Sequence, residues 1–194
     1  MDTQYYSPGK NSEVLDNSLL FCGSMDWLPN EDAIHFFIDE IFPLLRDEEP
    51  RISLTVVGRN PSPGLKNKVN RHSEINLTGW VEDTRPYFKK SFLYIVPIRI
   101  GGGTRMKIFE AMAMGMVVIS TSVGAEGLPV TDGENIFIED DPVRFARRIK
   151  ELLSKRGEST LIGQKARQFV ESNFSWKTVA DGFSRICKEA AREK

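Results

Sequence analysis

A run of three glycines followed by charged residues is the part of this chain whose residue types and spacing best suit chemistry. The glycines are Gly101, Gly102 and Gly103, and the pattern after them predicts a helix that begins near Thr104. Backbone without side chains can approach a ligand closely, and a helix N-terminus offers unpaired N–H groups and a partial positive charge. We therefore expect this loop, Thr104 included, to bind an anionic group.

Three charged side chains follow on the predicted helix, at Arg105, Lys107 and Glu110. Arg105 and Lys107 place positive charges in the first turn, where the helix dipole disfavours cations, so an anionic partner is expected there. Glu110 comes three residues after Lys107 and so shares its face of the helix. A nucleoside diphosphate would meet such a surface with its phosphates first and the hydroxyls of its ribose next.

The glycine loop differs from two familiar phosphate-binding motifs. No Gly-Lys-Ser or Gly-Lys-Thr follows at the spacing of a Walker loop. The third glycine of the dinucleotide-binding fingerprint is also absent after Gly103. The alternative interpretation is a plain turn, in which Lys107 and Glu110 form a solvated ion pair.

Composition limits the class of protein. Lysine and arginine total 26 against 27 acidic residues, for a formal charge of −1, so we expect no nucleic-acid partner. No apolar stretch approaches the ~20 residues of a membrane span, and no signal peptide is recognisable. Cys22 and Cys187 lack metal-ligand spacing, so we expect buried, reduced thiols, no metal site and a cytoplasmic location.

Short apolar runs alternate with helical patterns along most of the chain. Residues 1–18 are polar and predict a linker or loosely attached arm, and residues 19–194 predict one domain. The alternation predicts an α/β, Rossmann-like fold, in which helices cover both faces of a parallel β-sheet. Strands are expected at 19–23, 52–58, 75–78, 92–97, 117–120 and 136–138. Helices are expected at 30–46, 63–71, 81–89, 104–114, 142–153, 159–172 and 176–193.

The last predicted helix carries an apolar stripe on one face. Such a stripe indicates contact with the core or with a neighbouring domain. The stripe consists of Val179, Phe183, Ile186, Cys187 and Ala190.

Other polar residues are expected to be structural. His35 and His72 fit positions within or at the end of a helix. Asn30 or Asp32 is expected to cap the first helix, and Asp141, which precedes a proline, to cap a later one.

Several segments together resemble the donor-binding half of retaining GT-B glycosyltransferases of the family-4, or group 1, type. The segments are 20–24, 56–58, 78–83 and above all 105–127. The resemblance extends from about Asp2 to the end of the chain, and its opening, 2–8, resembles the interdomain linker. This implies that the N-terminal, acceptor-binding domain lies outside the chain.

The resemblance also implies roles for single residues. The glutamate of the family's most diagnostic stretch binds the ribose hydroxyls, and here it is Glu110. The base is implied to lie against the backbone of Val81, where Trp80 either stacks or packs. The nucleotide site is also expected to include Gly23, Gly58 and Arg59.

Two departures from the family pattern concern the sugar and the diphosphate. A second glutamate usually stands eight residues before the ribose-binding one, near the donor sugar, and Gly102 occupies that position. Many members also carry an arginine and a lysine after the first strand, and residues 24–30 contain neither. We expect Arg105 and Lys107 to replace them as the catalytic groups that stabilise the departing diphosphate without a metal ion.

The activity implied is that of a retaining hexosyltransferase with a UDP- or GDP-linked donor, no cofactor, and a role in cell-surface glycan or glycolipid synthesis. The chain alone is expected to be inactive without its own N-terminal domain, and the whole protein to be peripheral to a membrane. Two alternatives remain. One is a nucleotide-binding module without transfer chemistry, with Gly102 marking a lost sugar contact, and the other is a sugar-nucleotide epimerase of the GT-B fold.

Overall fold

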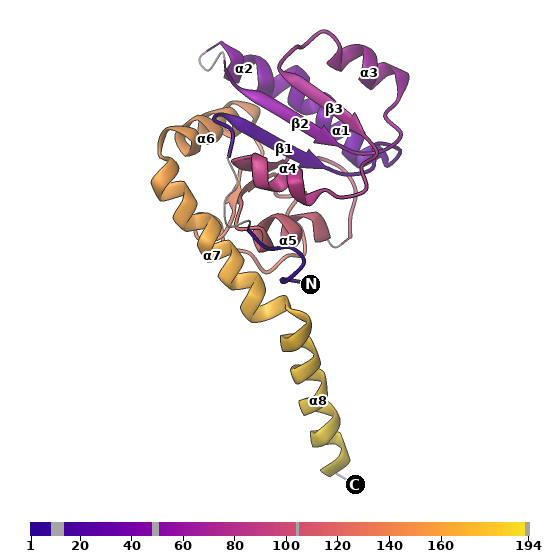
Figure 1. Ribbon diagram of the computed structural model, residues 1–194, viewed down its shortest axis with the longest axis vertical. Coiled ribbons are helices and arrows are strands. Elements are labelled where there is room, and N and C mark those ends of the chain that lie inside the picture. The colour runs from indigo at the N-terminus through magenta and orange to yellow at the C-terminus, as the bar shows by residue number, and fades with distance from the viewer. Residues whose placement is uncertain (9–13, 48–50, 104, 193–194) are drawn as a thin grey trace.

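A six-stranded parallel sheet forms the centre of the computed structural model, which describes residues 1–8, 14–47, 51–103 and 105–192 (Figure 1). The strand order is β3-β2-β1-β4-β5-β6. The strands are β1 (Ser18–Cys22), β2 (Ser53–Val57), β3 (Ile75–Gly79), β4 (Leu93–Val96), β5 (Val117–Ser120) and β6 (Phe137–Ile138). Every residue of β1, β4 and β5 is buried, as expected for parallel strands covered on both faces. The predicted α/β, Rossmann-like fold is confirmed.

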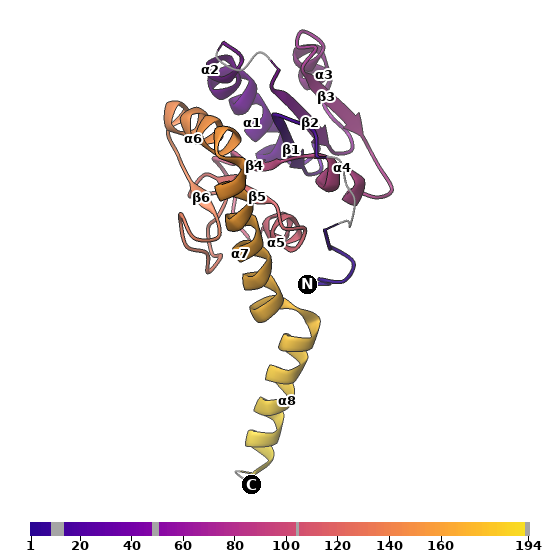
Figure 2. The same cartoon turned by 60° about the vertical axis from the view of Figure 1, so that its left-hand side comes forward.

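Helices lie on both sides of this sheet, with α1 on one side and α4 and α5 on the other (Figure 2). Their bounds are α1 (Leu28–Phe36), α2 (Phe42–Arg46), α3 (Pro63–Val69), α4 (Arg85–Lys90), α5 (Met106–Ala113), α6 (Pro142–Ser154), α7 (Arg156–Phe174) and α8 (Trp176–Arg192). The strand order reverses between β1 and β4, and ligands of such sheets bind at the carboxyl ends of strands near that reversal. The glycine loop follows β4, so the topology brings it to this edge.

Three helices begin or continue differently from the prediction. The helix expected over 30–46 contains a π-helical segment, η1 (Phe37–Ile41), because Pro43 has no N–H to continue the regular ladder. The helix α4 starts at Arg85 instead of residue 81, since the Asp83 carboxylate accepts a hydrogen bond from the Arg85 N–H at 2.9 Å and holds a turn there. The helix α5 starts at Met106, and Thr104 lies outside the described residues.

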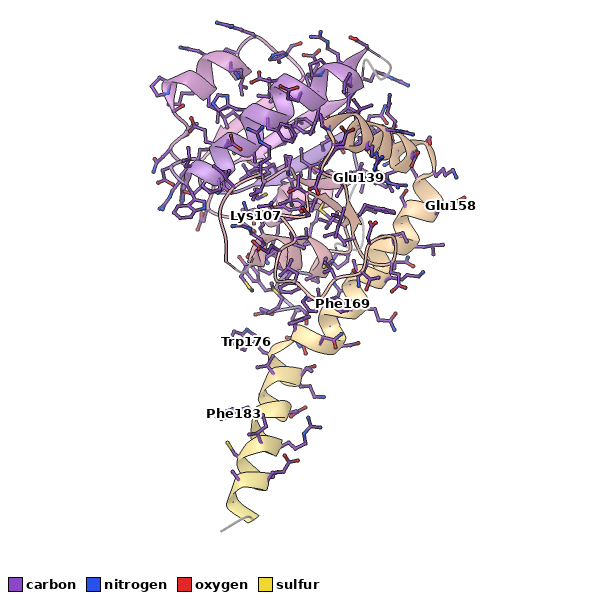
Figure 3. All side chains as sticks on the ribbon, turned by 180° about the vertical axis from the view of Figure 1, so that it is seen from behind. Lys107, Glu139, Glu158, Phe169, Trp176 and Phe183 are labelled. Carbon is purple, nitrogen blue, oxygen red and sulfur yellow. The ribbon has the colours of Figure 1, made fainter. Side chains whose placement is uncertain are left out.

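The C-terminal helices differ in how they meet the rest of the fold. The helix α7 packs along α5 and β5, whereas α8 extends away from the sheet (Figure 1). Figure 3 shows Trp176 at the start of α8 and Phe183 further along it, both outside the body of the fold. Their exposed fractions are 68% and 69%. The stripe therefore does not pack on the core, and the prediction that Cys187 is buried is wrong, whereas Cys22 is buried as expected.

Candidate functional site

A cavity of about 480 Å³ opens where β1, β2 and β3 end. Seven of the predicted site residues lie on its wall: Gly23, Gly58, Arg59, Trp80, Val81, Lys107 and Glu110. Residues that the sequence did not indicate also line it: Tyr6, Cys22, Ser24, Val57 and Thr84. Neither the three glycines of the loop nor Arg105 lines this cavity. Parallel topology explains the grouping, because all three strands end at one edge of the sheet.

The glycines at the ends of β1 and β2 allow two chain segments to approach closely. A side-chain carbon at Gly58 would lie 1.8 Å from the carbonyl oxygen of Gly23. A side-chain carbon at Gly23 would lie 2.7 Å from the ammonium nitrogen of Lys107. Backbone hydrogen bonds fix both segments, from the Gly23 N–H to Val57 and from the Gly58 N–H to Gly79. Glycine is therefore required at these positions by the packing around the cavity.

Replacing Gly58 by alanine is expected to lower the free energy of unfolding by ~2–4 kcal/mol, because the added methyl group overlaps fixed backbone. Gly64→Ala is the matched control, since Gly64 lies in α3 and a side-chain carbon there meets nothing closer than 3.5 Å. That control should be neutral or stabilising by ~0.5–1 kcal/mol. Urea denaturation measures both variants, and equal midpoints for the two would contradict the packing described.

Lys107 lies in the first turn of α5, with its ammonium group held against the end of β1. Its Nζ donates to the Asn30 Oδ1 at 2.6 Å and lies 4.5 Å from the ring centroid of Phe21. Burial, followed by the nearby Arg105 charge, lowers the pKa of Lys107 to about 8, although Cys22 and Glu110 act in the opposite direction. The interpretation of Lys107 as part of a solvated pair is therefore wrong.

Asn30 supports the cavity through Lys107, although the sequence predicted only a helix-capping role for it. The helix α1 begins at Leu28, so Asn30 lies within its first turn and is not the cap. Its amide Nδ2 donates to the Ser24 carbonyl at 2.8 Å while its Oδ1 accepts from Lys107. Asn30 thus holds the Lys107 ammonium at the cavity. No local pattern pairs residues 77 positions apart, so nothing in the sequence indicated this contact.

Arg105 occupies the position just before α5 and is only 7% exposed. Its Nη1 donates to the Gly102 carbonyl at 3.1 Å, while its Nε and Nη2 are buried and find no hydrogen-bond partner among the described residues. The expectation that Arg105 stands in the first helical turn is wrong. Arg105 is instead a buried guanidinium with unpaired donors. Its charge gives the adjoining glycine loop a positive potential.

The glycine loop adopts backbone conformations that other residues rarely take. The φ angles of Gly101 and Gly103 are +94° and +93°, which lie in the left-handed region. All three glycines are exposed, and the Gly102 carbonyl binds Arg105. Anion binding by the loop stays a prediction, and Gly102 brings no carboxylate to the position where the resembled family has one.

Arg59 is the second cation on the cavity wall among the described residues. Its Nε donates to the Ser24 hydroxyl at 2.8 Å and lies 3.7 Å from an oxygen of Asp26. Asp26 also accepts from Ser24 and Asn60, and these hydrogen bonds lower the pKa of Asp26. An ionised Asp26 therefore keeps Arg59 at the rim, from which its exposed side chain can reach an anion in the cavity.

The rest of the cavity wall includes the turn after β3 and one face of α5. Trp80 is 71% exposed, so the alternative in which it packs into the core is wrong. Val81 is half-buried beside it. Glu110 faces the same cavity, and burial raises its pKa while a hydrogen bond from Tyr6 and the charge of Lys107 favour its ionised form. Lys107 and Glu110 thus share one face of α5, as their spacing predicted.

Residues expected to be structural lie outside this cavity. His35 pairs with Glu31 at 3.6 Å, and Asp32 forms an ion pair with Arg99 at 2.7 Å instead of capping α1. The ring of His72 packs edge-on against Phe42 with centroids 5.8 Å apart. The cap at Asp141 is confirmed, because its carboxylate accepts from the Arg144 N–H at 2.9 Å. Among the described residues, no group of three His, Cys, Asp or Glu side chains could hold a metal ion.

Comparison with known proteins identifies the family. Residues 16–155 match the family model described as glycosyl transferases group 1. The chain belongs to this glycosyltransferase family. An uncharacterized 44.6 kDa protein in the cps region of Klebsiella pneumoniae is 28% identical over 180 residues, which cover 89% of this chain and 45% of the relative. The chain spans about half the length of the curated relatives it matches.

Solved structures of glycosyltransferases share the fold. The C-terminal domain of a group 1 glycosyl transferase from Francisella tularensis gives a TM-score of 0.73 at 18% identity, covering 91% of this chain and 99% of that domain. Anabaena HepE, solved with UDP and glucose, gives 0.77 at 14% identity, covering 97% of this chain and 55% of HepE. The resemblance to the group 1 family and to the C-terminal half of the GT-B fold is confirmed.

No helix among the described residues of this glycosyltransferase chain is both long and apolar enough to cross a bilayer. The helix α8 approaches the necessary length, but charged residues interrupt it every few positions.

Proposed function

We propose that this chain is the donor-binding domain of a retaining hexosyltransferase that uses a UDP- or GDP-linked sugar. The observation that carries the proposal is the set of groups that line one cavity, which includes Trp80, Val81, Glu110, Lys107 and Arg59. We assign the base to Trp80 and the backbone of Val81, the ribose hydroxyls to Glu110, and the diphosphate to the cations Lys107 and Arg59. Solved relatives support this choice of ligand, because HepE was solved with UDP.

The proposed chemistry is stabilisation of the leaving group. As the bond between the sugar and the diphosphate breaks, negative charge develops on the departing phosphate. The Lys107 ammonium is held in place by Asn30, so it offers a fixed charge that needs no rearrangement during the reaction. Arg105 adds positive potential from below the loop that leads into α5. No metal ion is needed in this scheme.

The acceptor and the partner domain belong to the same proposal. The chain spans 45% of the Klebsiella relative, so we assign the acceptor site to an additional N-terminal domain. The exposed apolar stripe of α8, which includes Val179 and Ile186, is assigned to contact with that domain. A role in cell-surface glycan or glycolipid synthesis, at the membrane surface and on its cytoplasmic side, completes the proposal.

A nucleotide-binding module without transfer chemistry is the second candidate. It is favoured by Gly102, whose carbonyl binds Arg105 and which supplies no carboxylate near the donor sugar. Activity of the protein that carries both domains distinguishes the two. Release of UDP or GDP from a nucleotide hexose that accelerates with an acceptor glycan or lipid supports the transferase. Nucleotide binding with no release above the uncatalysed rate would support the module.

Arg59 offers a test of the diphosphate position. Arg59→Gln is expected to weaken UDP binding about fivefold, the effect of one charge-assisted hydrogen bond at an exposed site. Arg99→Gln is the matched control, because Arg99 is equally an exposed, ion-paired arginine but lies outside the cavity. Calorimetric titration with UDP and with uridine separates the contribution of the diphosphate from that of the nucleoside. A loss that is equal for uridine, which has no phosphate, would contradict the assignment.

A further inference from the structure

Tyr6 reaches the cavity from a part of the chain that precedes the sheet. It lies in a turn in which the Tyr6 N–H donates to the Asp2 carbonyl at 3.0 Å. Its ring packs edge-on against Phe88 of α4, with centroids 6.5 Å apart, and against Tyr5 at 5.1 Å. The half-buried Tyr6 side chain lines the cavity together with Glu110. A phenol from outside the sheet thus completes the nucleotide site.

The turn that carries Tyr6 is fastened at two further points. The Asp2 carboxylate accepts from the Tyr5 N–H at 2.8 Å. The Arg85 guanidinium lies 3.8 Å from the ring centroid of Tyr5 and pairs with Asp83 at 2.7 Å. These contacts tie the turn to the start of α4, so the position of the Tyr6 hydroxyl is set by the fold.

Tyr6 and Glu110 lie on the wall of the same cavity, and each affects the protonation of the other. Burial, followed by the charge of Glu110, raises the pKa of Tyr6 to about 12, so the phenol keeps its proton at neutral pH. The contact with Tyr6 favours the ionised form of Glu110, against the effect of burial. The titratable groups that face Glu110 are Tyr6, Lys107, Cys22 and Tyr94. Of these, Cys22 and Tyr94 are buried and neutral, with pKa values raised by burial.

We propose that Tyr6 is a positioning residue for ribose recognition, whose hydroxyl orients the Glu110 carboxylate toward the 2′ and 3′ hydroxyls of the nucleotide. This rests on the proposed function, because it assumes that Glu110 binds ribose. A carboxylate has two oxygens with about four acceptor positions, so one hydrogen bond from Tyr6 leaves enough acceptors for two vicinal hydroxyls. The substrate class is therefore a ribonucleotide diphosphate, and a deoxyribonucleotide is disfavoured.

The loss of the hydroxyl would act in two ways. The carboxylate would be free to turn toward Lys107 on its own helix, away from the ribose. It would also lose a hydrogen bond that favours the charged form, so a larger fraction would be protonated. Both effects weaken binding of a ribose with two hydroxyls and leave the base contacts unchanged.

Calorimetric titration of the chain with UDP and with 2′-deoxy-UDP tests the proposal. If guanine is the preferred base, GDP and 2′-deoxy-GDP are used in their place. Tyr6→Phe removes the hydroxyl and keeps the ring, and Tyr5→Phe is the matched control from the same turn. We expect Tyr6→Phe to bind UDP about fivefold more weakly than the unmodified chain does, which is the effect of losing one charge-assisted hydrogen bond. For the deoxynucleotide, we expect the loss of affinity in Tyr6→Phe to be less than about twofold. Tyr5→Phe should match the unmodified chain for both ligands.

Three results would overturn the proposal. An equal loss for both nucleotides in Tyr6→Phe would mean that the hydroxyl does not act through the ribose. Unchanged UDP binding in that variant would mean that Glu110 needs no support. In both cases the proposed function survives. An unmodified chain that binds no ribonucleotide would instead remove the proposed function and the role of Tyr6 together.

A second measurement needs no nucleotide. Carbon NMR of glutamate-labelled protein follows the titration of Glu110, with Glu110→Gln assigning the signal. The pKa of Glu110 is expected to rise in Tyr6→Phe and to stay unchanged in Tyr5→Phe, because only the first variant loses the hydrogen bond. An unchanged pKa in Tyr6→Phe would contradict the contact itself.

Discussion

Replacing Glu110 by glutamine is expected to weaken UDP binding about 30-fold, within the ~10–100-fold range for losing hydrogen bonds to a charged group. Glutamine has the size of glutamate but only one acceptor oxygen and no charge. It therefore cannot take two vicinal hydroxyls and the Tyr6 hydroxyl together. Calorimetric titration measures the loss.

The control for this variant is Glu126→Gln, because Glu126 is an exposed glutamate in the loop after β5 and is not on the cavity wall. It should bind UDP like the unmodified chain. Stability separates binding from folding. Burial raises the pKa of Glu110, so its charge opposes folding, and Glu110→Gln should unfold at the same or a higher urea concentration. A variant that binds UDP normally would remove Glu110 from the site.

Binding of UDP is expected to depend on pH through Lys107. The pKa of Lys107 is lowered to about 8, so the ammonium form that attracts a diphosphate prevails below that pH and is lost above it. At about pH 9 roughly a tenth of the sites are charged, and affinity should be about tenfold below its value near pH 7. Lys107→Met should bind about 50-fold more weakly near pH 7, with no further loss as pH rises, as expected on losing a half-buried charge contact.

The same group has the opposite effect on stability. The pKa of Lys107 is about 8 in the folded chain and 10.5 in the unfolded chain, so the unfolded chain binds more protons between these values. The free energy of unfolding should therefore rise with pH across this window, and the rise should disappear in Lys107→Met. Lys68→Met, which removes a half-buried lysine paired with Asp39, is the control and should keep both pH dependences. A flat affinity profile in the unmodified chain would contradict a charged Lys107 at the diphosphate.

The sequence predicted those features that depend on local patterns. Alternating apolar runs predicted the strands, because buried parallel strands read as continuous apolar segments. The spacing of Lys107 and Glu110 predicted that both face one side of α5, and the cavity brings them together. The order of the strands was known only from the structure. That order explains why Gly23 and Gly58, which follow different strands, meet at the cavity.

Contacts between distant segments could not be read from the sequence. Asn30 is of a residue type common at helix caps. Its pairing with Lys107 depends on the neighbouring positions of β1 and β4, which bring the first turns of α1 and α5 to one edge of the sheet. Arginine is usually found at the surface, and Arg105 is buried only because of the path that the glycine loop takes. Tyr6 lies in a polar segment with no periodicity. Its place beside Glu110 is set by α4, against which it packs.

Calorimetric titration with UDP, GDP and ADP, without and with magnesium, shows whether this chain carries a nucleotide-sugar site. We expect one nucleotide, UDP or GDP, to bind more tightly than the others, magnesium not to be required, and Glu110→Gln to abolish most of the heat. Binding of none of the three at millimolar concentration, or equal binding by Glu110→Gln, would contradict such a site.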